Sequence, residues 1–393
     1  MSVALAERVK RIKPSPTVAL NGRVVRLRAE GRDIIGLGVG EPDFDTPAHI
    51  GDAGVAAIRS GFTRYTPVEG TAELKDAIAA KFRRDNTLEY SRSQILVSTG
   101  AKQTIYNMAM AVMNPGDEAV IPAPYWVSYP DIVLLADGVP VLPYCGPDRG
   151  YKIAPAQLEA AITPRTRLFI LNSPNNPTGA AYTRAELAAL GEVLLRHPRV
   201  LICTDDMYEH IYWGSEPFCS LLTAVPALYD RTVTVNGVSK SYAMTGWRIG
   251  YCGGPAEIVD AMATIQSQST TNPSSIAQKA ATAALLGDQS CVTEMNGHFR
   301  ARHDFFNAGL NRLPGFTVLP AAGTFYAWCD VTGAIRRLGL PDDHAFAEYL
   351  LEKAGVAGVP GSAFGGAGHI RFSFATSREL LAEALERIGH ALG

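Results

Sequence analysis

A lysine and an arginine eight positions apart are the side chains of this chain whose types and spacing most clearly suggest chemistry. Lys240 comes shortly after an expected strand at residues 232–236, and Arg248 ends the run Ser-Lys-Ser-Tyr-Ala-Met-Thr-Gly-Trp-Arg. A primary amine can condense with an aldehyde, and a guanidinium can hold a phosphate through two parallel hydrogen bonds. Pyridoxal 5′-phosphate carries both groups, so the run predicts a site for this cofactor. A lone lysine is usually only solvated, and the prediction therefore depends on the other motifs.

A glycine follows the expected strand at residues 95–98, in the segment Thr-Gly-Ala-Lys-Gln that opens a helix. Ligands bind at the carboxyl ends of the strands in open parallel sheets. Gly100 lets the backbone come close to a ligand, and the free N–H groups at a helix start suit a phosphate. Many glycines only turn the chain, but together with Arg248 this segment predicts a phosphate cup.

Two further strand ends carry groups that could contact a pyridine ring. The strand at 168–172 precedes a turn in which Asn176 offers an amide donor to a ring hydroxyl. The strand at 200–204 precedes Asp205, whose carboxylate can pair with a protonated pyridine nitrogen. Tyr208 lies three residues further on and could bond the same oxygen as Asn176. The plainer alternatives are an ordinary turn and a helix N-cap.

An aromatic residue and a second arginine extend this set. Trp126 follows the expected strand at 119–122, and its flat ring either stacks on the cofactor or belongs to an ordinary core. Arg371 lies in the alternating run at 369–373. It is a bidentate clamp for a substrate carboxylate if it faces a cleft, and a surface residue otherwise.

The elements that must position these residues alternate between helical patterns and short apolar runs. This alternation predicts an α/β fold with a mainly parallel sheet sandwiched by helices. The expected strands are residues 95–98, 119–122, 139–142, 168–172, 200–204 and 232–236. Helix starts are expected at Thr46, with Pro47 at the first helical position, at Thr71, and at a capping box from Thr183 to Glu186.

The pattern changes near Ser290, and this change suggests a second domain. A long helix towards Leu313 is followed by expected strands at 325–330 and 369–373 and helices at 344–354 and 377–392. We therefore expect a large cofactor-binding domain at 46–285 and a smaller α+β domain at 286–393, which residues 1–45 join in part as an N-terminal arm.

Composition excludes several classes of protein. The 393 residues carry a formal net charge of −2, without the basic surplus of a nucleic-acid-binding protein. No apolar stretch is long enough to span a bilayer, and residues 1–16 lack the apolar core of a secretory signal. The six cysteines and eight histidines are dispersed without metal-binding spacing. We expect a metal-free cytoplasmic protein with no nucleic-acid or membrane partner.

These motifs together resemble those of the fold-type I, class I aminotransferases, in the bacterial aspartate/prephenate aminotransferase subgroup. The similarity runs from Lys-Pro-Ser at residues 13–15, through Gly-Glu-Pro-Asp-Phe-Asp-Thr-Pro at 40–47, to the strand with Arg371. It implies an enzyme that exchanges an amino group between an amino acid and a 2-oxo acid in a ping-pong mechanism. It also implies a homodimer with shared active sites.

The resemblance assigns a role to each candidate residue. Lys240 would bond to the cofactor aldehyde and then move the α-proton of the substrate, with Asp205 at the ring nitrogen and Tyr208 at the phenolic oxygen. The phosphate contacts would be Gly100, Ala101, Lys102, Ser239, Arg248 and Tyr65, the last from the neighbouring subunit. The contacts to the ring and the substrate would be Trp126, Asn176, Gly40 and Arg371, with Gly40 and Arg371 at the substrate carboxylate.

The substrate stays open. Lys102 resembles the residue of this subgroup near a side-chain carboxylate, which favours aspartate or glutamate as donor and 2-oxoglutarate as acceptor. Lys13 and Thr17 lie where relatives that use prephenate read their larger substrate, so prephenate or aromatic amino transfer is an alternative. A lyase or an oxidase that uses the same cofactor is another.

Overall fold

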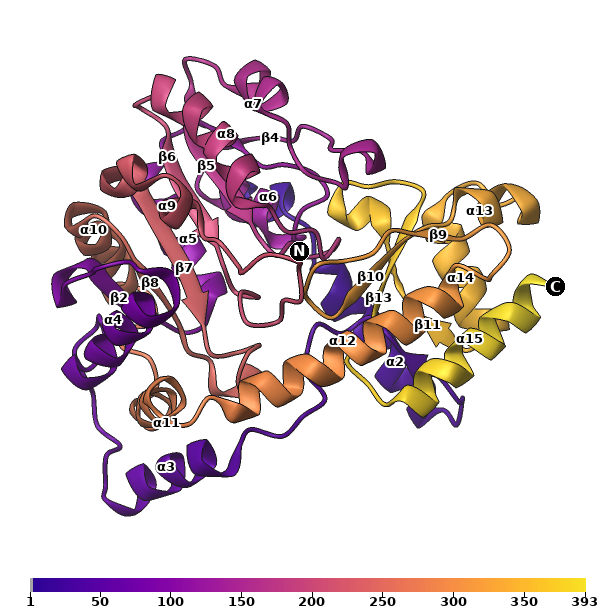
Figure 1. Ribbon diagram of the computed structural model, residues 1–393, viewed down its shortest axis with the longest axis horizontal. Helices are drawn as coiled ribbons and strands as arrows, with labels where there is room; N and C mark the ends of the chain where they lie inside the picture. The colour runs from indigo at the N-terminus through magenta and orange to yellow at the C-terminus, as the bar shows by residue number, and fades with distance from the viewer. Residues whose placement is uncertain (1–2) are drawn as a thin grey trace.

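A computed structural model describes residues 3–393 of the chain. Figure 1 shows a large group of elements around one sheet and a smaller group around the C-terminal strands and helices. The long helix α12, Ser290–Leu310, extends from near α11 in the large group to α15 in the small group. None of the helices in residues 3–393 has the length and apolar character needed to cross a bilayer.

The large group is built on a seven-stranded sheet with the order β2-β8-β7-β6-β5-β3-β4. β8 is antiparallel to both of its neighbours, and the other pairs are parallel. The strands are β2 Ile95–Ser98, β3 Glu118–Val120, β4 Val139–Val141, β5 Thr166–Asn172, β6 Leu201–Asp205, β7 Thr232–Gly237 and β8 Gly250–Gly253. This arrangement confirms the predicted α/β class. β8 was not predicted from the sequence, because this short strand has a glycine at each end and glycine is depleted in strands.

Helices cover both faces of this sheet, which explains why its strands are apolar throughout. In β5, Leu168 and Ile170 pack on one side with α5, α6 and α10, while Phe169 and Leu171 pack on the other side with α3, α4, α7, α8, α9 and α11. The first set comprises α5 Ala101–Val112, α6 Ser128–Leu135 and α10 Ala256–Ser267. The second set comprises α3 Ala48–Arg59, α4 Ala72–Asn86, α7 Pro155–Ala161, α8 Arg184–Arg196, α9 Leu221–Ala224 and α11 Ser275–Leu286.

Two of the three expected helix starts are confirmed. The backbone N–H of Leu74 donates to Oγ1 of Thr71 at 3.3 Å, which caps α4. The N–H of Glu186 donates to Oγ1 of Thr183 at 3.2 Å, and the N–H of Thr183 donates back to Glu186 at 2.8 Å. These contacts satisfy backbone donors that have no partner within the helix.

The third expected start, at Thr46, is wrong. The N-cap of α3 is Pro47 and the helix begins at Ala48, so Pro47 is not its first residue. The hydroxyl of Thr46 instead donates to the carbonyl of Ala243 at 2.7 Å and accepts from Nε1 of Trp247 at 3.0 Å. Thr46 therefore joins the approach to α3 to the loop that follows Lys240.

The small group contains a four-stranded antiparallel sheet with the order β12-β13-β10-β9. Its strands are β9 Thr317–Val318, β10 Tyr326–Asp330, β12 Val359–Pro360 and β13 His369–Ser373. The N-terminal strand β1, Ile35–Gly36, pairs in parallel with β11, Val356–Ala357. The remaining helices are α1 Glu7–Arg11, α2 Pro16–Ala29, α13 Thr332–Leu338, α14 Asp343–Lys353 and α15 Arg378–Leu392. The β1–β11 pair joins the N-terminal and C-terminal segments. It thereby brings residues 37–41 towards the carboxyl ends of the strands in the seven-stranded sheet.

Candidate active site

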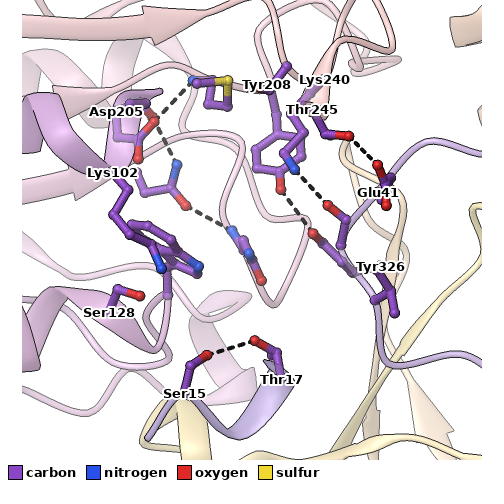
Figure 2. A pocket seen from close by; sticks show the side chains of 18 of the residues that line it. Ser15, Thr17, Glu41, Lys102, Ser128, Asp205, Tyr208, Lys240, Thr245 and Tyr326 are labelled. Atoms are coloured by element: carbon purple, nitrogen blue, oxygen red, sulfur yellow. Dashed lines mark hydrogen bonds between the residues drawn. The ribbon is translucent and has the colours of Figure 1, made fainter. Parts of the chain in front are cut away.

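A cavity of about 460 Å³ lies where β5, β6 and β7 end, and residues from the small group close its other side (Figure 2). Eleven of the thirteen predicted site residues line it: Gly40, Ala101, Lys102, Trp126, Asn176, Asp205, Tyr208, Ser239, Lys240, Arg248 and Arg371. Gly100 lies directly beside Arg248. Tyr65 is outside the set of described residues that line the cavity, and its side chain is 90% exposed.

Lys240 follows β7, and its amine reaches across the cavity. Its Nζ donates to the carbonyl oxygen of Gly40 at 2.6 Å. Burial lowers the pKa of this amine to about 8, with Arg248 and Arg371 lowering it further and Glu41 opposing the shift. An amine with this pKa is neutral for part of the time near neutral pH, so it can act as a nucleophile and as a base.

Asp205 is the last residue of β6 and is almost fully buried. Oδ2 accepts a hydrogen bond from the hydroxyl of Tyr129 at 2.6 Å, and Oδ1 accepts from the N–H of Met207 at 3.2 Å. Burial raises the pKa of Asp205, while these two hydrogen bonds and the charge of Lys240 lower it. The chain continues in turns after β6, so the alternative of a helix N-cap is wrong. A carboxylate facing a cavity can pair with a protonated ring nitrogen.

Arg371 lies in the middle of β13 and is 1% exposed, so the alternative of a surface arginine is wrong. Nη1 donates to Oδ1 of Asn176 at 2.9 Å, and Nη2 donates to the carbonyl of Gly38 at 2.6 Å. The guanidinium lies between the rings of Tyr326, at 4.3 Å, and Phe364, at 4.8 Å. Its Nε has no hydrogen-bond partner among the described residues. A buried cation with a free donor is suited to a carboxylate.

Tyr208 connects the two sides of the cavity. Its hydroxyl lies 2.9 Å from that of Tyr326, which comes from β10 in the small group. A Cβ atom on Gly40 would lie 2.4 Å from the same Tyr326 hydroxyl. Position 40 therefore needs glycine, because a side chain there would displace Tyr326.

Positive charge and free backbone donors gather at the start of α5. Gly100 is the N-cap of this helix with φ +83°, and a Cβ on it would lie 2.4 Å from Nη2 of Arg248. A Cβ on Gly250 would lie 2.1 Å from the backbone nitrogen of Ala101. Lys102 lies 5.0 Å from the ring of Trp126, and burial with the charge of Arg248 lowers its pKa. The two glycines thus let β8 and the Arg248 guanidinium pack directly against this helix start, where backbone N–H groups and a cation suit an anion.

Several lining residues were not predicted from the sequence. They include Glu41, Tyr129, Asn172, Thr245 and Tyr326. Asn172 ends β5, and its Nδ2 donates to the carbonyl of Asp205 at 2.8 Å while Oδ1 accepts from the N–H of Asn176. Its position at a strand end could have identified it, by the same reasoning that identified Asp205. Tyr129 and Tyr326 carry no comparable signal, since they occur within an apolar helix and an apolar strand.

The family is shown by comparison with known proteins. Residues 32–388 match the model of the family described as aminotransferase class I and II. The chain belongs to this family and is a transaminase.

Its place within the family follows from its relatives. The chain is 58% identical over 394 residues to the aspartate/prephenate aminotransferase of Nitrosomonas europaea, with 99% of each chain covered. It is 54% identical over 389 residues to that of Cereibacter sphaeroides, with 98% of this chain and 97% of the relative covered. These similarities confirm the predicted membership of the aspartate/prephenate subgroup.

Solved structures confirm the fold-type I architecture. The aspartate aminotransferase of Rhizobium meliloti superposes with a TM-score of 0.95 at 48% identity, and covers 100% of this chain and 99% of its own. That of Thermus thermophilus with maleate superposes with a TM-score of 0.94 at 42% identity, and covers 99% of this chain and 100% of its own.

Proposed function

We propose that the chain uses pyridoxal 5′-phosphate to move an amino group from aspartate or glutamate to a 2-oxo acid such as 2-oxoglutarate. One observation carries this proposal: the amine of Lys240, the carboxylate of Asp205 and the guanidinium of Arg371 all line a single cavity. Each belongs to a different part of the chain, and each is a group that the cofactor or an amino acid substrate requires.

The residues present fit the cofactor. Because Gly100 carries no side chain, the Arg248 guanidinium lies directly beside the start of α5, where a phosphate can be held. Trp126 lines the same cavity and offers a flat face to the cofactor ring. Asp205, the last residue of β6, also lines it, and its carboxylate can pair with the ring nitrogen. When bound, the cofactor supplies an aldehyde that bonds to amines and a ring that withdraws electrons.

The protein's own groups divide the remaining work. Lys240 would bond to the aldehyde of the cofactor. Once a substrate amine has replaced Lys240 there, its free Nζ would take the proton from the substrate α-carbon and later return that proton to a different carbon atom. The lowered pKa of about 8 makes this proton transfer accessible near neutral pH. Arg371 would hold the α-carboxylate of the substrate, which aligns the α-carbon with Nζ.

Substrate choice would depend on the side of the cavity formed by Lys102 and the start of α2. Ser15 and Thr17 line this side, with their hydroxyl oxygens 3.0 Å apart. Lys102 offers a cation for a second carboxylate, which favours aspartate and glutamate. Prephenate carries a carboxylate as well, and the two relatives described above are aspartate/prephenate aminotransferases, so prephenate is the second candidate acceptor.

A panel of amino donors and oxo acceptors tests this function. We expect the purified protein with pyridoxal 5′-phosphate to convert aspartate and 2-oxoglutarate to equal amounts of glutamate and a new 2-oxo acid. Release of ammonia or uptake of oxygen in place of amino transfer would favour the lyase and oxidase alternatives. The variant Lys102→Met tests the role of the Lys102 cation. It should reduce kcat/KM for aspartate more than for phenylalanine.

We further propose that the active enzyme is a homodimer in which Tyr65 serves the partner's phosphate site. Tyr65 is 90% exposed in the single chain, and Val55 and Ile58 on α3 are exposed as well. Mixing inactive Lys240→Ala protein with Tyr65→Ala protein should restore activity, because one site of each hybrid dimer would keep both residues. No recovery after verified exchange of subunits would contradict shared sites.

The domain boundaries also remain our proposal. We place the large cofactor-binding domain at residues 46–285 and the small domain at 286–393, with residues 1–45 as an arm that joins the small domain in part. The β1–β11 pair supports this division, since it ties Ile35 and Gly36 to the C-terminal segment. Limited proteolysis should cut first near these boundaries.

A further inference from the structure

Tyr129 makes a direct contact with the carboxylate that faces the cavity. It lies in the first turn of α6 and bonds to a different carboxylate oxygen of Asp205 from the one that accepts from the N–H of Met207. Its hydroxyl donates to Oδ2 of Asp205 at 2.6 Å, and both side chains are buried. A hydrogen bond from a hydroxyl to a carboxylate is among the stronger kinds in proteins.

The electrostatics fix the direction of this hydrogen bond. Burial and the negative charge of Asp205 raise the pKa of Tyr129 well above its ordinary value, so the hydroxyl stays protonated and acts as the donor. This donor stabilises the ionised form of Asp205 against the effect of burial. Without it, Asp205 would hold a proton more readily.

The ring of Tyr129 is held in place from two sides. It meets the ring of Trp126 edge to face, with centroids 5.3 Å apart, and it packs in the apolar cluster between α5, α6 and the sheet. The backbone N–H of Tyr129 donates to the carbonyl of Trp126 at 3.0 Å. The hydroxyl is therefore aimed at Asp205 by a packed side chain.

We propose that Tyr129 is a positioning residue that keeps Asp205 ionised and directed towards the ring nitrogen of the cofactor. This inference rests on the proposed function, because it requires Asp205 to meet that nitrogen. A proton shared between a carboxylate and a pyridine nitrogen moves towards the stronger base. Loss of the Tyr129 hydroxyl strengthens Asp205 as a base and so shifts the proton away from the ring, which weakens the electron withdrawal that transamination needs.

The test compares the affinity of the cofactor-free protein for pyridoxal 5′-phosphate and for its analogue with carbon in place of the ring nitrogen. Tyr129→Phe should reduce the preference for the natural cofactor by about tenfold, since hydrogen bonds to charged groups are worth roughly this factor or more. Its affinity for the analogue should stay near that of the unmodified protein. If Tyr129 had a purely structural role, the affinity for both compounds would fall equally in Tyr129→Phe, and this result would overturn the proposal.

Tyr90→Phe is the matched control. Tyr90 is also buried in the large group, and its hydroxyl lies 3.3 Å from Oγ1 of Thr234, away from the cavity. Both affinities should be unchanged in this variant. If Tyr129→Phe does not fold, 3,5-difluorotyrosine at position 129 provides a stronger donor, and the preference should then increase; an unchanged preference would overturn the proposal.

The outcomes separate this inference from the function on which it rests. Equal affinity of the unmodified protein for the two compounds would contradict the assignment of Asp205 and would overturn the role of Tyr129 with it. A clear preference in the unmodified protein that persists fully in Tyr129→Phe would overturn the role of Tyr129 alone.

Discussion

The protein contains two buried clusters built around a lysine, and they differ in how completely the charges are matched. Lys81 on α4 is 1% exposed and forms an ion pair with Glu209, while its Nζ also donates to Oδ1 of Asn86 at 2.7 Å. Glu209 accepts further hydrogen bonds from Asn86 and Asn236, each at 2.8 Å. Asp85 lies 3.7 Å from the same amine. The amine of Lys81 is thus paired with a buried carboxylate and a hydrogen-bond acceptor.

The amine of Lys240 forms no such ion pair with any of the described residues. It donates to the carbonyl of Gly40, which brings no negative charge, and Nε of Arg371 has no partner among the described residues. Arg248 and Arg371 both lower the pKa of the amine. The two clusters are adjacent in the sequence: Tyr208 lines the cavity with Lys240, and the next residue, Glu209, pairs with Lys81. A buried lysine that is paired with a carboxylate thus contributes to stability, whereas a lysine without such a partner is available to bind a ligand.

Removing the amine of Lys240 should have the largest effect on activity. Lys240→Ala should reduce kcat by about 10⁴-fold or more, since both covalent attachment and proton transfer are lost. The free energy of unfolding should not fall, because the variant no longer buries a poorly matched amine. Steady-state kinetics and urea unfolding measure the two effects. Turnover within tenfold of the unmodified protein would contradict the assignment.

Removing the amine of Lys81 should have the opposite pattern. Lys81→Met leaves Glu209 buried without its cation, and we expect a loss of about 3–5 kcal/mol in the free energy of unfolding. The folded fraction should keep its KM values. The control is Lys279→Met, which breaks a largely exposed ion pair with Glu73 and should cost about 1 kcal/mol or less. Equal losses in the two variants would show that burial does not distinguish these pairs.

Arg371 sharpens the comparison at the substrate end. Arg371→Lys keeps the charge but loses the planar fork, and we expect kcat/KM to fall by about 100-fold for every amino donor. Arg378→Lys, at a cation on the ring of Phe305, should leave kcat/KM unchanged. A loss confined to aspartate would instead place Arg371 at the side-chain carboxylate of the substrate.

The pH dependence of stability gives the smallest effect. The pKa of Lys240 is about 8 in the folded, cofactor-free protein, against an ordinary value of 10.5. Between these values the unfolded chain binds more protons, so stability rises with pH through this window. Below about pH 8, the buried charge of Lys240 lowers the free energy of unfolding by its full amount. The unfolding free energy of Lys240→Met, measured from pH 7 to 10, should lack this rise, whereas identical curves would contradict the lowered pKa.

The sequence predicted most strongly the part of the site that follows the strands of the large sheet. Gly100, Asn176, Asp205 and Lys240 come directly after apolar runs, and parallel strands bring such positions to one edge. The expected strands at 95–98 and 369–373 agree with β2 and β13, and the others differ from the structure by one or two residues at their ends.

The rest depends on contacts between distant segments. Gly40 reaches Lys240 because β1 pairs with β11, and because the N–H of Ser373 donates to the carbonyl of Leu37 at 2.7 Å. Tyr129 and Tyr326 occur in apolar segments, and only the folded chain shows their hydroxyls at the cavity. Thr46 was misplaced because its hydroxyl finds partners in the loop after Lys240, which helix-capping rules do not consider.

Chemical trapping of the cofactor tests the central claim most directly. The purified protein would be loaded with pyridoxal 5′-phosphate, reduced with borohydride, digested and examined by peptide mass spectrometry. We predict that the label is on Lys240, in the peptide that contains Ser239 and Ser241, and that Lys81 and Lys102 are unlabelled. A label on Lys102 or Lys81, or no label on a protein that retains activity, would contradict the account.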